Sequence, residues 1–324
     1  MKALPLIFMF SGQGSQYYHM GKELFEGNSF FRNSLQELDE IAQVHLGYSV
    51  IQEMYNTNRS AADAFNQTRF THPAIYMFEV AQAKMLINLG ICPDYVMGTS
   101  MGTFAAASLA GCLDEEKMLL AVIKQSELIA AQCEPGFMVA ILENPILFQR
   151  EAQLYSQSVL ASTNFDGHFV VSTNVAGLST IEHFLKQQQI SYQVLAVSHA
   201  FHSQWIDSAQ ESYLDFLKSQ EFQIMNIPLI CCMKAEMVSY ISEVYFWKVI
   251  REPIEFRRTA ELFESTGSYH YLDLGPSGTL ATLLKYILPE NSQSKVTAMM
   301  TPYGFNSNGL EQLIKEHQPI ESIV

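Results

Sequence analysis

Short, continuously apolar runs alternate along the chain with longer segments that carry an apolar residue every three or four positions. The first apolar run, 4–10, ends in glycine and serine, and the run 94–98 ends in the same way. Such a run is typical of a strand buried on both faces of a parallel sheet. Helical spacing follows at 28–55 and 71–90. The alternation therefore predicts an α/β fold built on a mainly parallel sheet.

The rhythm changes between residues 132 and 198. Four strand-like runs lie there, with helical patterns after the first and the third: 137–142, 158–165, 169–173 and 191–197, with helices at 145–157 and 179–189. The order strand–helix–strand–strand–helix–strand is that of a ferredoxin-like module. We therefore predict a ferredoxin-like (βαββαβ) small subdomain at 132–198. It would be inserted into a large subdomain formed by 1–131 and 199–324.

Composition and charge exclude several classes of protein. The 324 residues are 48% hydrophobic, enough for a large core, yet no apolar run reaches the roughly 20 residues of a membrane helix. The first residues do not resemble a signal peptide, so we expect a cytoplasmic protein. Five cysteines without a C-x-x-C pair argue against disulfides and against a zinc site. A net charge of −14 argues against nucleic acid as a ligand, but not against an acidic protein partner.

The segment Gly98-Thr99-Ser100-Met101-Gly102 joins a predicted strand to an alanine-rich helix. The pattern G-x-S-x-G fits a nucleophile elbow, a sharp turn that exposes a serine oxygen at the end of a sheet. The helix that follows directs backbone N–H groups toward developing negative charge. From the pentapeptide alone, a glycine-rich turn with a chance serine fits equally well.

A serine hydroxyl needs a base to become a nucleophile. Nine histidines are candidates, and those in turns or on helix surfaces, such as His168 and His183, look incidental. The pair His199 and His202 differs, because it lies where the inserted module returns to the large subdomain. Such a junction is a natural wall of a cleft.

Together these segments resemble the malonyl-CoA:acyl carrier protein acyltransferase family. The loop 11–16 (Ser-Gly-Gln-Gly-Ser-Gln) looks like its N-terminal signature, 98–102 like its serine elbow, and 199–203 (His-Ala-Phe-His-Ser) like its histidine motif. Weaker matches are 251–256 and 274–278, in the order of the family. The resemblance implies an α/β-hydrolase-like large subdomain with a ferredoxin-like insertion.

The resemblance also implies roles for individual residues. Ser100 would be the acyl-accepting nucleophile and His202 its general base and acid. The backbone N–H groups of Gln13 and Met101 would form the oxyanion hole. The family orients its histidine through a backbone carbonyl four residues before the proline of a Pro-Val/Ile-x-Phe motif. That proline is Pro253 here, so the carbonyl would be that of Val249. Neither a bound cofactor nor a metal is implied, since CoA or the phosphopantetheine arm of a carrier protein belongs to the substrate.

One departure from the family bears on the substrate. Malonyl-selecting members carry an arginine 25 residues after the elbow serine, and Gln125 stands at that position. Burying a carboxylate without a cation costs several kcal/mol, whereas a hydrogen bond from a neutral amide contributes about 1 kcal/mol. Lys124 is a poor substitute because it points about 100° away on a helix. We expect neutral acyl chains, and we expect Gln125→Arg to restore malonyl loading.

Further residues are expected around the substrate. His199 and Phe201 match the malonyl-type sequence and would shape the pocket. Thr99 replaces the usual histidine of the elbow, and His72 replaces a frequent glutamine. Asn164 resembles a family asparagine near the substrate, although a plain turn residue fits as well. The whole set looks like the standalone acyl hydrolases of trans-acyltransferase polyketide synthases, which clear stalled acyl groups from carrier proteins.

The sequence therefore favours an acyl hydrolase that acts on neutral thioesters of acyl carrier proteins in polyketide, and hence antibiotic, biosynthesis. An acyltransferase that moves an acetyl or malonyl group from CoA to a carrier protein is the alternative, because every residue named above would serve both reactions. A non-catalytic homologue would be expected to have lost Ser100 or His202. The expected partners are acyl carrier protein domains of a polyketide synthase, and we expect a monomer.

Overall fold

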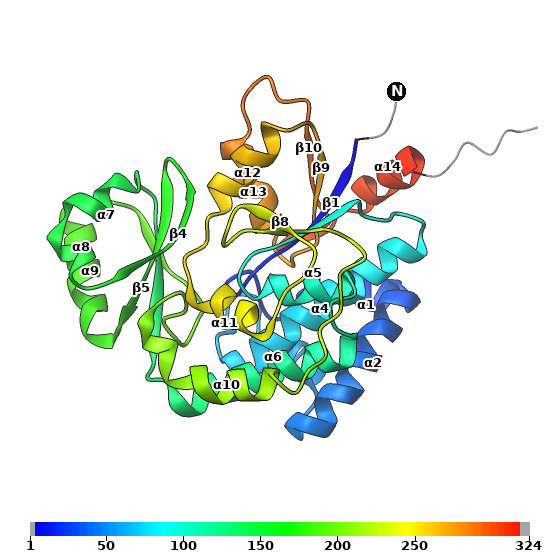
Figure 1. Ribbon diagram of the computed structural model, residues 1–324, viewed down its shortest axis with the longest axis horizontal. Helices are drawn as coiled ribbons and strands as arrows, with labels where there is room; N and C mark the ends of the chain where they lie inside the picture. Colours follow the sequence, from blue (N-terminus) through cyan, green and yellow to red (C-terminus); the bar gives the residue numbers. More distant parts are fainter. Residues whose placement is uncertain (1–3, 318–324) are drawn as a thin grey trace, which may run out of the picture.

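A computed structural model describes residues 4–317, which are organised around two β-sheets. Figure 1 shows the larger sheet, with β1, β9 and β10, among most of the helices, and the smaller sheet, with β4 and β5, on the left. The smaller sheet and its helices come from one continuous stretch of chain, shown in green.

The larger sheet has the order β10-β9-β1-β2-β7-β8, and only β8 runs antiparallel to its neighbour. Its strands are β1 (Leu6–Phe10), β2 (Tyr95–Gly98), β7 (Leu229–Cys231), β8 (Glu236–Val238), β9 (His270–Asp273) and β10 (Lys295–Ala298). Every residue of β1 is buried, and its side chains alternate between two hydrophobic cores. The continuous apolar run of the sequence thus forms a central strand, as predicted.

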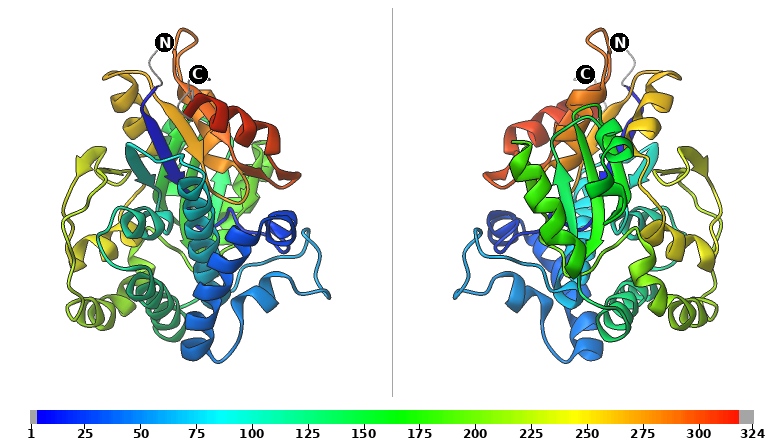
Figure 2. Two further views of the ribbon diagram at one scale, coloured as in Figure 1. Left: turned by 90° about the vertical axis from the view of Figure 1, so that its right-hand side faces the viewer. Right: turned by 90° about the vertical axis from the view of Figure 1, so that its left-hand side faces the viewer.

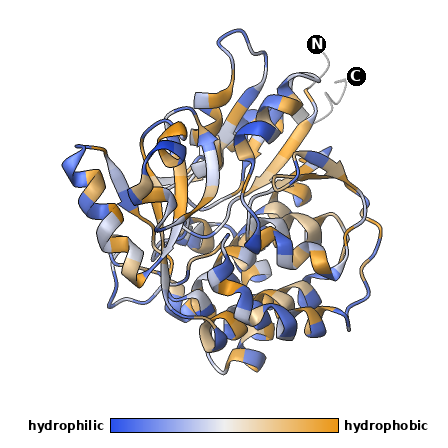
Figure 3. Ribbon diagram, turned by 60° about the vertical axis from the view of Figure 1, so that its left-hand side comes forward, coloured by the Kyte–Doolittle hydropathy of each residue, from blue (hydrophilic) through white to orange (hydrophobic). Residues whose placement is uncertain are grey.

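Helices cover both faces of this sheet, so the fold is α/β, as predicted. The first core lies among α2 (Ser29–Leu46), α4 (Thr68–Asn88), α5 (Gly102–Leu109) and α6 (Glu115–Gln132). The second lies against α12 (Phe256–Glu264) and α13 (Thr279–Ile287). In Figure 3 the strands of the sheet are predominantly apolar, whereas the helices around it alternate apolar and polar residues.

The remaining elements surround these layers. They are α1 (Lys22–Gly27), α3 (Val50–Met54), the 3₁₀ helix η1 (Gln204–Ala209), α10 (Gln210–Leu217), α11 (Glu243–Arg251), β11 (Met300–Thr301), β12 (Gly304–Phe305) and α14 (Ser307–His317). Within residues 4–317, no helix combines the length and the apolar character that a membrane crossing requires.

Helix α4 starts earlier than the sequence indicates. Thr71 resembles a helix cap, but the helix begins at Thr68 and Thr71 lies inside it. The Thr71 hydroxyl instead accepts a hydrogen bond from the Gln13 side chain at 3.0 Å. A side chain that resembles a cap therefore connects α4 to the loop after β1.

The smaller sheet has the order β4-β5-β3-β6 and is antiparallel throughout. Its elements are β3 (Gly136–Ile141), α7 (Ile146–Arg150), α8 (Ala152–Tyr155), β4 (Val159–Phe165), β5 (His168–Asn174), α9 (Val175–Gln187) and β6 (Tyr192–Val194). This is the predicted βαββαβ order with a ferredoxin-like strand arrangement. The boundaries at 132 and 198 stay a prediction.

Two details of this module differ from the sequence prediction. The first helix is divided, because Glu151 adopts an extended conformation between α7 and α8. The second helix begins at Val175, and the Asn174 side chain caps it by accepting a hydrogen bond from the Gly177 N–H. Ser179, the first residue of the helix predicted from the sequence, lies within the helix. Asparagine is a strong N-cap residue, so the earlier start satisfies the helix end.

Candidate active site

Ser100 lies in a strained turn between β2 and α5. Its φ of +51° is in the left-handed region, which a residue with a side chain rarely adopts. A Cβ at Gly98 would lie 2.3 Å from the Thr103 Cα, and one at Gly102 would lie 2.2 Å from the Phe10 carbonyl oxygen. Both glycines are therefore required by close approach, and the turn has the form of a nucleophile elbow.

The structure brings His202 to Ser100 from the junction after the inserted module. The Ser100 Oγ and His202 Nε2 atoms are 2.8 Å apart, and His202 Nδ1 is 2.7 Å from the Glu252 carbonyl oxygen. A carbonyl only accepts hydrogen bonds, so Nδ1 carries the proton. Nε2 is then free to accept the Ser100 proton. This is the tautomer that a general base requires.

Burial keeps this imidazole neutral. Desolvation lowers the pKa of His202 to about 4, and the hydrogen bond to the Glu252 carbonyl opposes that shift only in part. At neutral pH the ring is therefore an unprotonated base. It becomes an acid once it has taken the serine proton.

The prediction that the Val249 carbonyl orients His202 was wrong. The structure places the carbonyl of Glu252, not that of Val249, beside His202. Helix α11 ends at Arg251, and Glu252 follows in an extended conformation. A carbonyl inside a helix points along the helix axis, whereas the extended residue turns its carbonyl aside. The Val249 side chain is buried; it does not line the main cavity beside Ser100 but borders a smaller one that Ser100 also lines.

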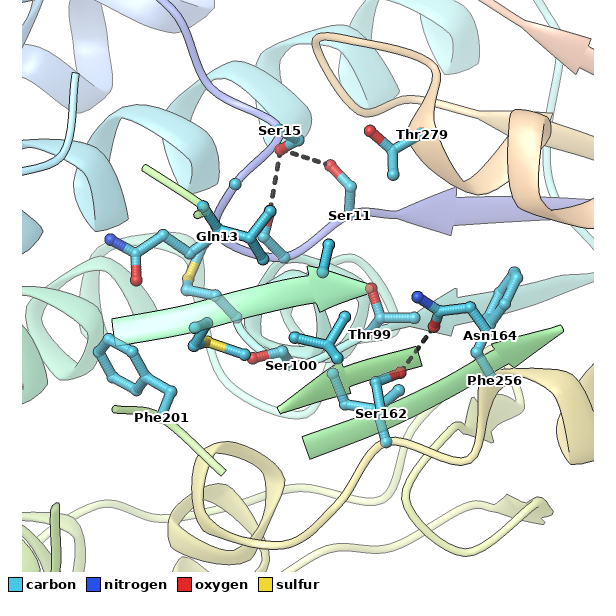
Figure 4. A pocket seen from close by; sticks show the side chains of 18 of the residues that line it. Ser11, Gln13, Ser15, Thr99, Ser100, Ser162, Asn164, Phe201, Phe256 and Thr279 are labelled. Atoms are coloured by element: carbon cyan, nitrogen blue, oxygen red, sulfur yellow. Dashed lines mark hydrogen bonds between the residues drawn. The ribbon is translucent and has the colours of Figure 1, made fainter. Parts of the chain in front are cut away.

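The loop after β1 packs directly on the elbow. Gln13 and Met101 both line the cavity that contains Ser100, and Figure 4 shows Gln13 in the loop beside the serine. Met101 occupies the N-cap position of α5, where backbone N–H groups have no partner inside the helix. Two N–H groups can thus face the oxygen of an acyl group on Ser100, which is the arrangement of an oxyanion hole.

A cavity of about 270 Å³ extends from Ser100 between the two sheets. Its apolar wall consists of Met138, Ala140, Val170, Leu195, Phe201, Ile250, Ile254, Phe256, Leu280 and Leu283. Its polar wall, apart from Ser100 and His202, consists of Ser11, Gln13, Ser15, His72, Thr99, Ser162, Asn164, His168, Gln193 and Thr279. Among the described residues, the lining contains no lysine, arginine, aspartate or glutamate.

The two other histidines in the wall do not supply a positive charge at neutral pH. Desolvation and the neighbouring His199 lower the pKa of His72 to about 3, and burial lowers the pKa of His168. The His72 ring lies 5.2 Å from the Phe201 ring, and its Nε2 is 3.1 Å from the Gln13 Oε1 atom. The cavity is therefore uncharged.

Gln125 does not reach this cavity. It is 1% exposed and lies beside His72 and Tyr213, whose pKa values its amide affects. These contacts lack full hydrogen-bond geometry, and no partner is found for either amide atom among residues 4–317. His72, on the preceding long helix, lines the cavity in its place. The prediction that Gln125 contacts the acyl group is therefore not supported, and His72 occupies the position nearer the substrate.

The other predicted residues divide between the cavity and its surroundings. Thr99 and Asn164 line it, and the Asn164 amide is held by Ser162 Oγ at 2.6 Å and His168 Nδ1 at 2.9 Å. His199 does not line the cavity, because its Nδ1 is turned to Ser198 Oγ at 3.0 Å.

Sequence reasoning missed several polar residues of the wall. They are Ser162, His168 and Gln193 from the small sheet, and Thr279 from the start of α13. His168 had looked incidental in its turn. The available signal was its spacing of four residues from Asn164 across a tight hairpin, which brings the two side chains to one face of that hairpin.

Known proteins resemble this chain over most of its length. The sequence model of a family described as an acyl transferase domain matches residues 7–311. The polyketide biosynthesis acyltransferase homolog PksD of Bacillus subtilis is 43% identical over 299 residues, 92% of each chain. Its counterpart BaeD of Bacillus velezensis is 42% identical over 309 residues, 95% of each chain.

Solved structures share the fold. A loading acyltransferase from the avermectin modular polyketide synthase superimposes with a TM-score of 0.86 at 19% identity, covering 96% of this chain and 99% of that one. The malonyl CoA-acyl carrier protein transacylase of Coxiella burnetii gives a TM-score of 0.80 at 22% identity, covering 98% and 100%. At these identities the likeness concerns the fold alone.

Proposed function

The chain belongs to the acyl transferase family, and we propose that it hydrolyses neutral acyl thioesters carried by acyl carrier proteins of a polyketide synthase. One observation carries the proposal: a hydrogen-bonded serine–histidine pair opens into a cavity without a charged side chain among its described lining residues. The names of the two bacterial relatives support the polyketide setting. The resemblance to proofreading acyl hydrolases supports water as the acceptor.

The first half of the reaction follows from the Ser100–His202 geometry. The His202 Nε2 atom takes the Ser100 proton as Oγ attacks the thioester carbonyl. The backbone N–H groups of Gln13 and Met101 stabilise the negative oxygen of the tetrahedral intermediate. As the intermediate collapses, the protonated His202 returns its proton to the departing sulfur. An acyl-serine and a free phosphopantetheine thiol result.

In the second half of the reaction, water is the nucleophile and Ser100 is the leaving group. The thiol departs, and a water molecule enters the place it vacates beside His202. Its proton moves to Nε2 as its oxygen attacks the acyl-serine carbonyl. As this second intermediate collapses, His202 returns the proton to Ser100 Oγ, which releases the carboxylic acid and restores the Ser100 hydroxyl. The chain's own groups suffice for every proton transfer, so the proposal includes no bound cofactor.

The uncharged wall determines which acyl groups enter. A malonyl carboxylate would lose its hydration in the cavity and find no cation, at a cost of several kcal/mol. An acetyl or longer neutral chain would instead contact the apolar wall formed by residues such as Met138, Val170 and Phe201. We therefore infer that short or medium neutral acyl chains are the substrates.

The acceptor is tested directly by following the acyl group. An acetyl-loaded carrier protein is incubated with the enzyme and a second, unloaded carrier protein of different mass, and both are measured by intact-protein mass spectrometry. The expected result is free acetate and unloaded donor, with no acetyl on the acceptor. Acetyl accumulating on the acceptor at the rate of donor loss would contradict hydrolysis and establish transfer.

A further inference from the structure

A buried carboxyl group lies beneath the oxyanion loop, which we define as residues 11–16. Glu79 belongs to α4, is 0% exposed and does not line the cavity over Ser100. It therefore has no direct route to a substrate. A buried glutamate needs compensating contacts, and those that Glu79 makes lead to the loop that carries Gln13.

The contacts join Glu79 to both hydrogen-bond donors of Ser11, its N–H and its hydroxyl. Its Oε1 atom accepts the Ser11 N–H at 2.6 Å and lies 2.9 Å from the Ser11 Oγ atom. The Ser11 hydroxyl is also 2.9 Å from Ser15 Oγ, which donates to the Gly12 carbonyl at 2.9 Å. Figure 4 shows the hydrogen bond between Ser11 and Ser15. The hydrogen bonds enclose the segment that contains Gln13.

Steric contacts leave Ser11 little room to move. A Cβ at Gly275 would lie 2.3 Å from Ser11 Oγ, and a Cβ at Gly102 would lie 2.5 Å from the Ser11 carbonyl oxygen. Ser11 is thus packed between the serine elbow and the loop after β9, with Glu79 on the side of α4. A shift of Ser11 would be transmitted directly to Gln13, two residues further along.

Glu79 has the electrostatic character that this position requires. Burial raises its pKa well above the usual range, and the neighbouring Asp273 adds to the effect. Asp273, itself fully buried, has its pKa raised to about 6 by the same cause. The carboxyl group accepts the Ser11 N–H, and burial favours its neutral form, which reduces the negative charge close to the oxygen that becomes negative during catalysis.

We propose that Glu79 is a positioning residue that fixes the Gln13 N–H in the oxyanion hole by holding Ser11. It acts through the loop and touches no reacting atom. A displaced oxyanion donor weakens binding of the transition state more than binding of the substrate. Loss of Glu79 is therefore expected to lower kcat rather than to raise KM. The inference rests on an acyl-serine forming at Ser100, and holds for a hydrolase and a transferase alike.

The test compares three variants on p-nitrophenyl acetate, whose release of p-nitrophenol in the first turnover reports acylation of Ser100 before any acceptor removes the acetyl group. The kcat and KM compared are the maximal rate and the half-saturating concentration of this first turnover. Glu79→Ala should lower kcat by about 10- to 100-fold, less than the roughly 100- to 1,000-fold known for complete loss of an oxyanion donor, and leave KM within about threefold. Glu79→Gln keeps an oxygen acceptor in a side chain of the same shape and should stay within about threefold of the wild type in both constants.

Gln82 provides the matched control. It lies one turn further along α4, is also 0% exposed, and forms no hydrogen bond to the oxyanion loop. Gln82→Leu should therefore keep the wild-type kcat, which separates loop positioning from a general disturbance of the helix.

Two results would overturn the proposal: a wild-type kcat in folded Glu79→Ala, or a kcat in Glu79→Gln as low as in Glu79→Ala. If Glu79→Ala does not fold, Ser11→Ala decides. It removes the hydroxyl link and keeps the N–H, so kcat should fall by about 3- to 10-fold at constant KM. An unchanged kcat in Ser11→Ala would refute the role. Activity on the ester without hydrolysis of carrier-protein thioesters would count against the proposed function alone.

Discussion

The two ends of the active-site cavity differ in how completely their polar groups are paired. At the reaction end, both ring nitrogens of His202 have partners, Ser100 on one side and the Glu252 carbonyl on the other. At the acyl end, His72 Nδ1 and both amide atoms of Gln125 have no hydrogen-bond partner in the described chain. The reaction end is held by paired contacts, whereas the acyl end adjoins buried polar atoms that have no such partner.

This contrast separates chemistry from selectivity. The complete pairing at Ser100 and His202 holds a reactive geometry that serves any acyl group. The unpaired polar atoms around His72 lie in the region where, by resemblance, malonyl-type members of the family bind a carboxylate with an arginine. Changes at the reaction end should therefore affect all substrates equally, and changes at the acyl end should alter the ratio between substrates.

The largest effect is expected from removing the base. His202→Ala should lower kcat by at least about 10³-fold for every acyl thioester, because Ser100 then has no proton acceptor. Release of free thiol from acetyl-loaded carrier protein measures the rate. His183→Ala, which removes an exposed histidine of α9, is the matched control and should be unaffected. A reduction that differs between acetyl and malonyl substrates would break the separation of the two ends.

A smaller effect, on the substrate ratio, is expected at the acyl end. Contrary to the expectation from the sequence, Gln125→Arg alone should leave malonyl turnover within about threefold of the wild type, because His72 lies on the cavity side of residue 125. The double change His72→Gln with Gln125→Arg should raise malonyl turnover relative to acetyl by about 100-fold, the value of an ion pair worth about 2.7 kcal/mol. Malonyl loading of Ser100 is followed by mass spectrometry.

Two outcomes decide between the residues. Full malonyl loading in Gln125→Arg alone would show that His72 is no barrier and that the position of residue 125 is sufficient. Failure of the double variant to load malonyl, while it still hydrolyses acetyl thioesters, would show that the uncharged wall is not the cause of selectivity.

The smallest effect is expected in the pH dependence of stability. Burial lowers the pKa of His72 from 6.5 to about 3, so between these values the unfolded chain binds a proton that the folded chain does not. The contribution of His72 to stability is therefore lost as the pH falls through 6.5. Between pH 7 and pH 5, the free energy of unfolding should decrease by about 2 kcal/mol more in the wild type than in His72→Gln.

Urea unfolding at several pH values measures this difference. His202, Glu79 and Asp273 also titrate with shifted pKa values, but they are present in both proteins, so their contributions cancel in the comparison. Parallel curves for the wild type and His72→Gln would contradict a buried, neutral His72.

Much of the reaction end could be predicted from the sequence because its residues lie in short motifs. The glycines of 98–102 report a local close approach, and the pair at Ser100 and His202 follows from two continuous segments in a known order. The α/β alternation and the inserted βαββαβ module could likewise be predicted from the sequence, since each depends on local periodicity.

The acyl end could not be predicted in the same way, because its wall is assembled from distant segments. His168 and Gln193 come from the small sheet, His72 from α4 and Thr279 from α13. No local pattern indicates that His72 rather than Gln125 lines the cavity. The Glu252 carbonyl was missed for a similar reason, since the end of helix α11 decides which backbone oxygen turns toward His202.

The central claim is that the uncharged cavity selects neutral acyl groups. It is tested most directly by offering the wild-type enzyme an equal mixture of acetyl- and malonyl-loaded forms of one carrier protein and following both by mass spectrometry. We predict that the acetyl form is consumed at least about 100-fold faster, because the malonyl carboxylate finds no cation in the cavity. Equal consumption of the two forms, or faster consumption of the malonyl form, would contradict the claim.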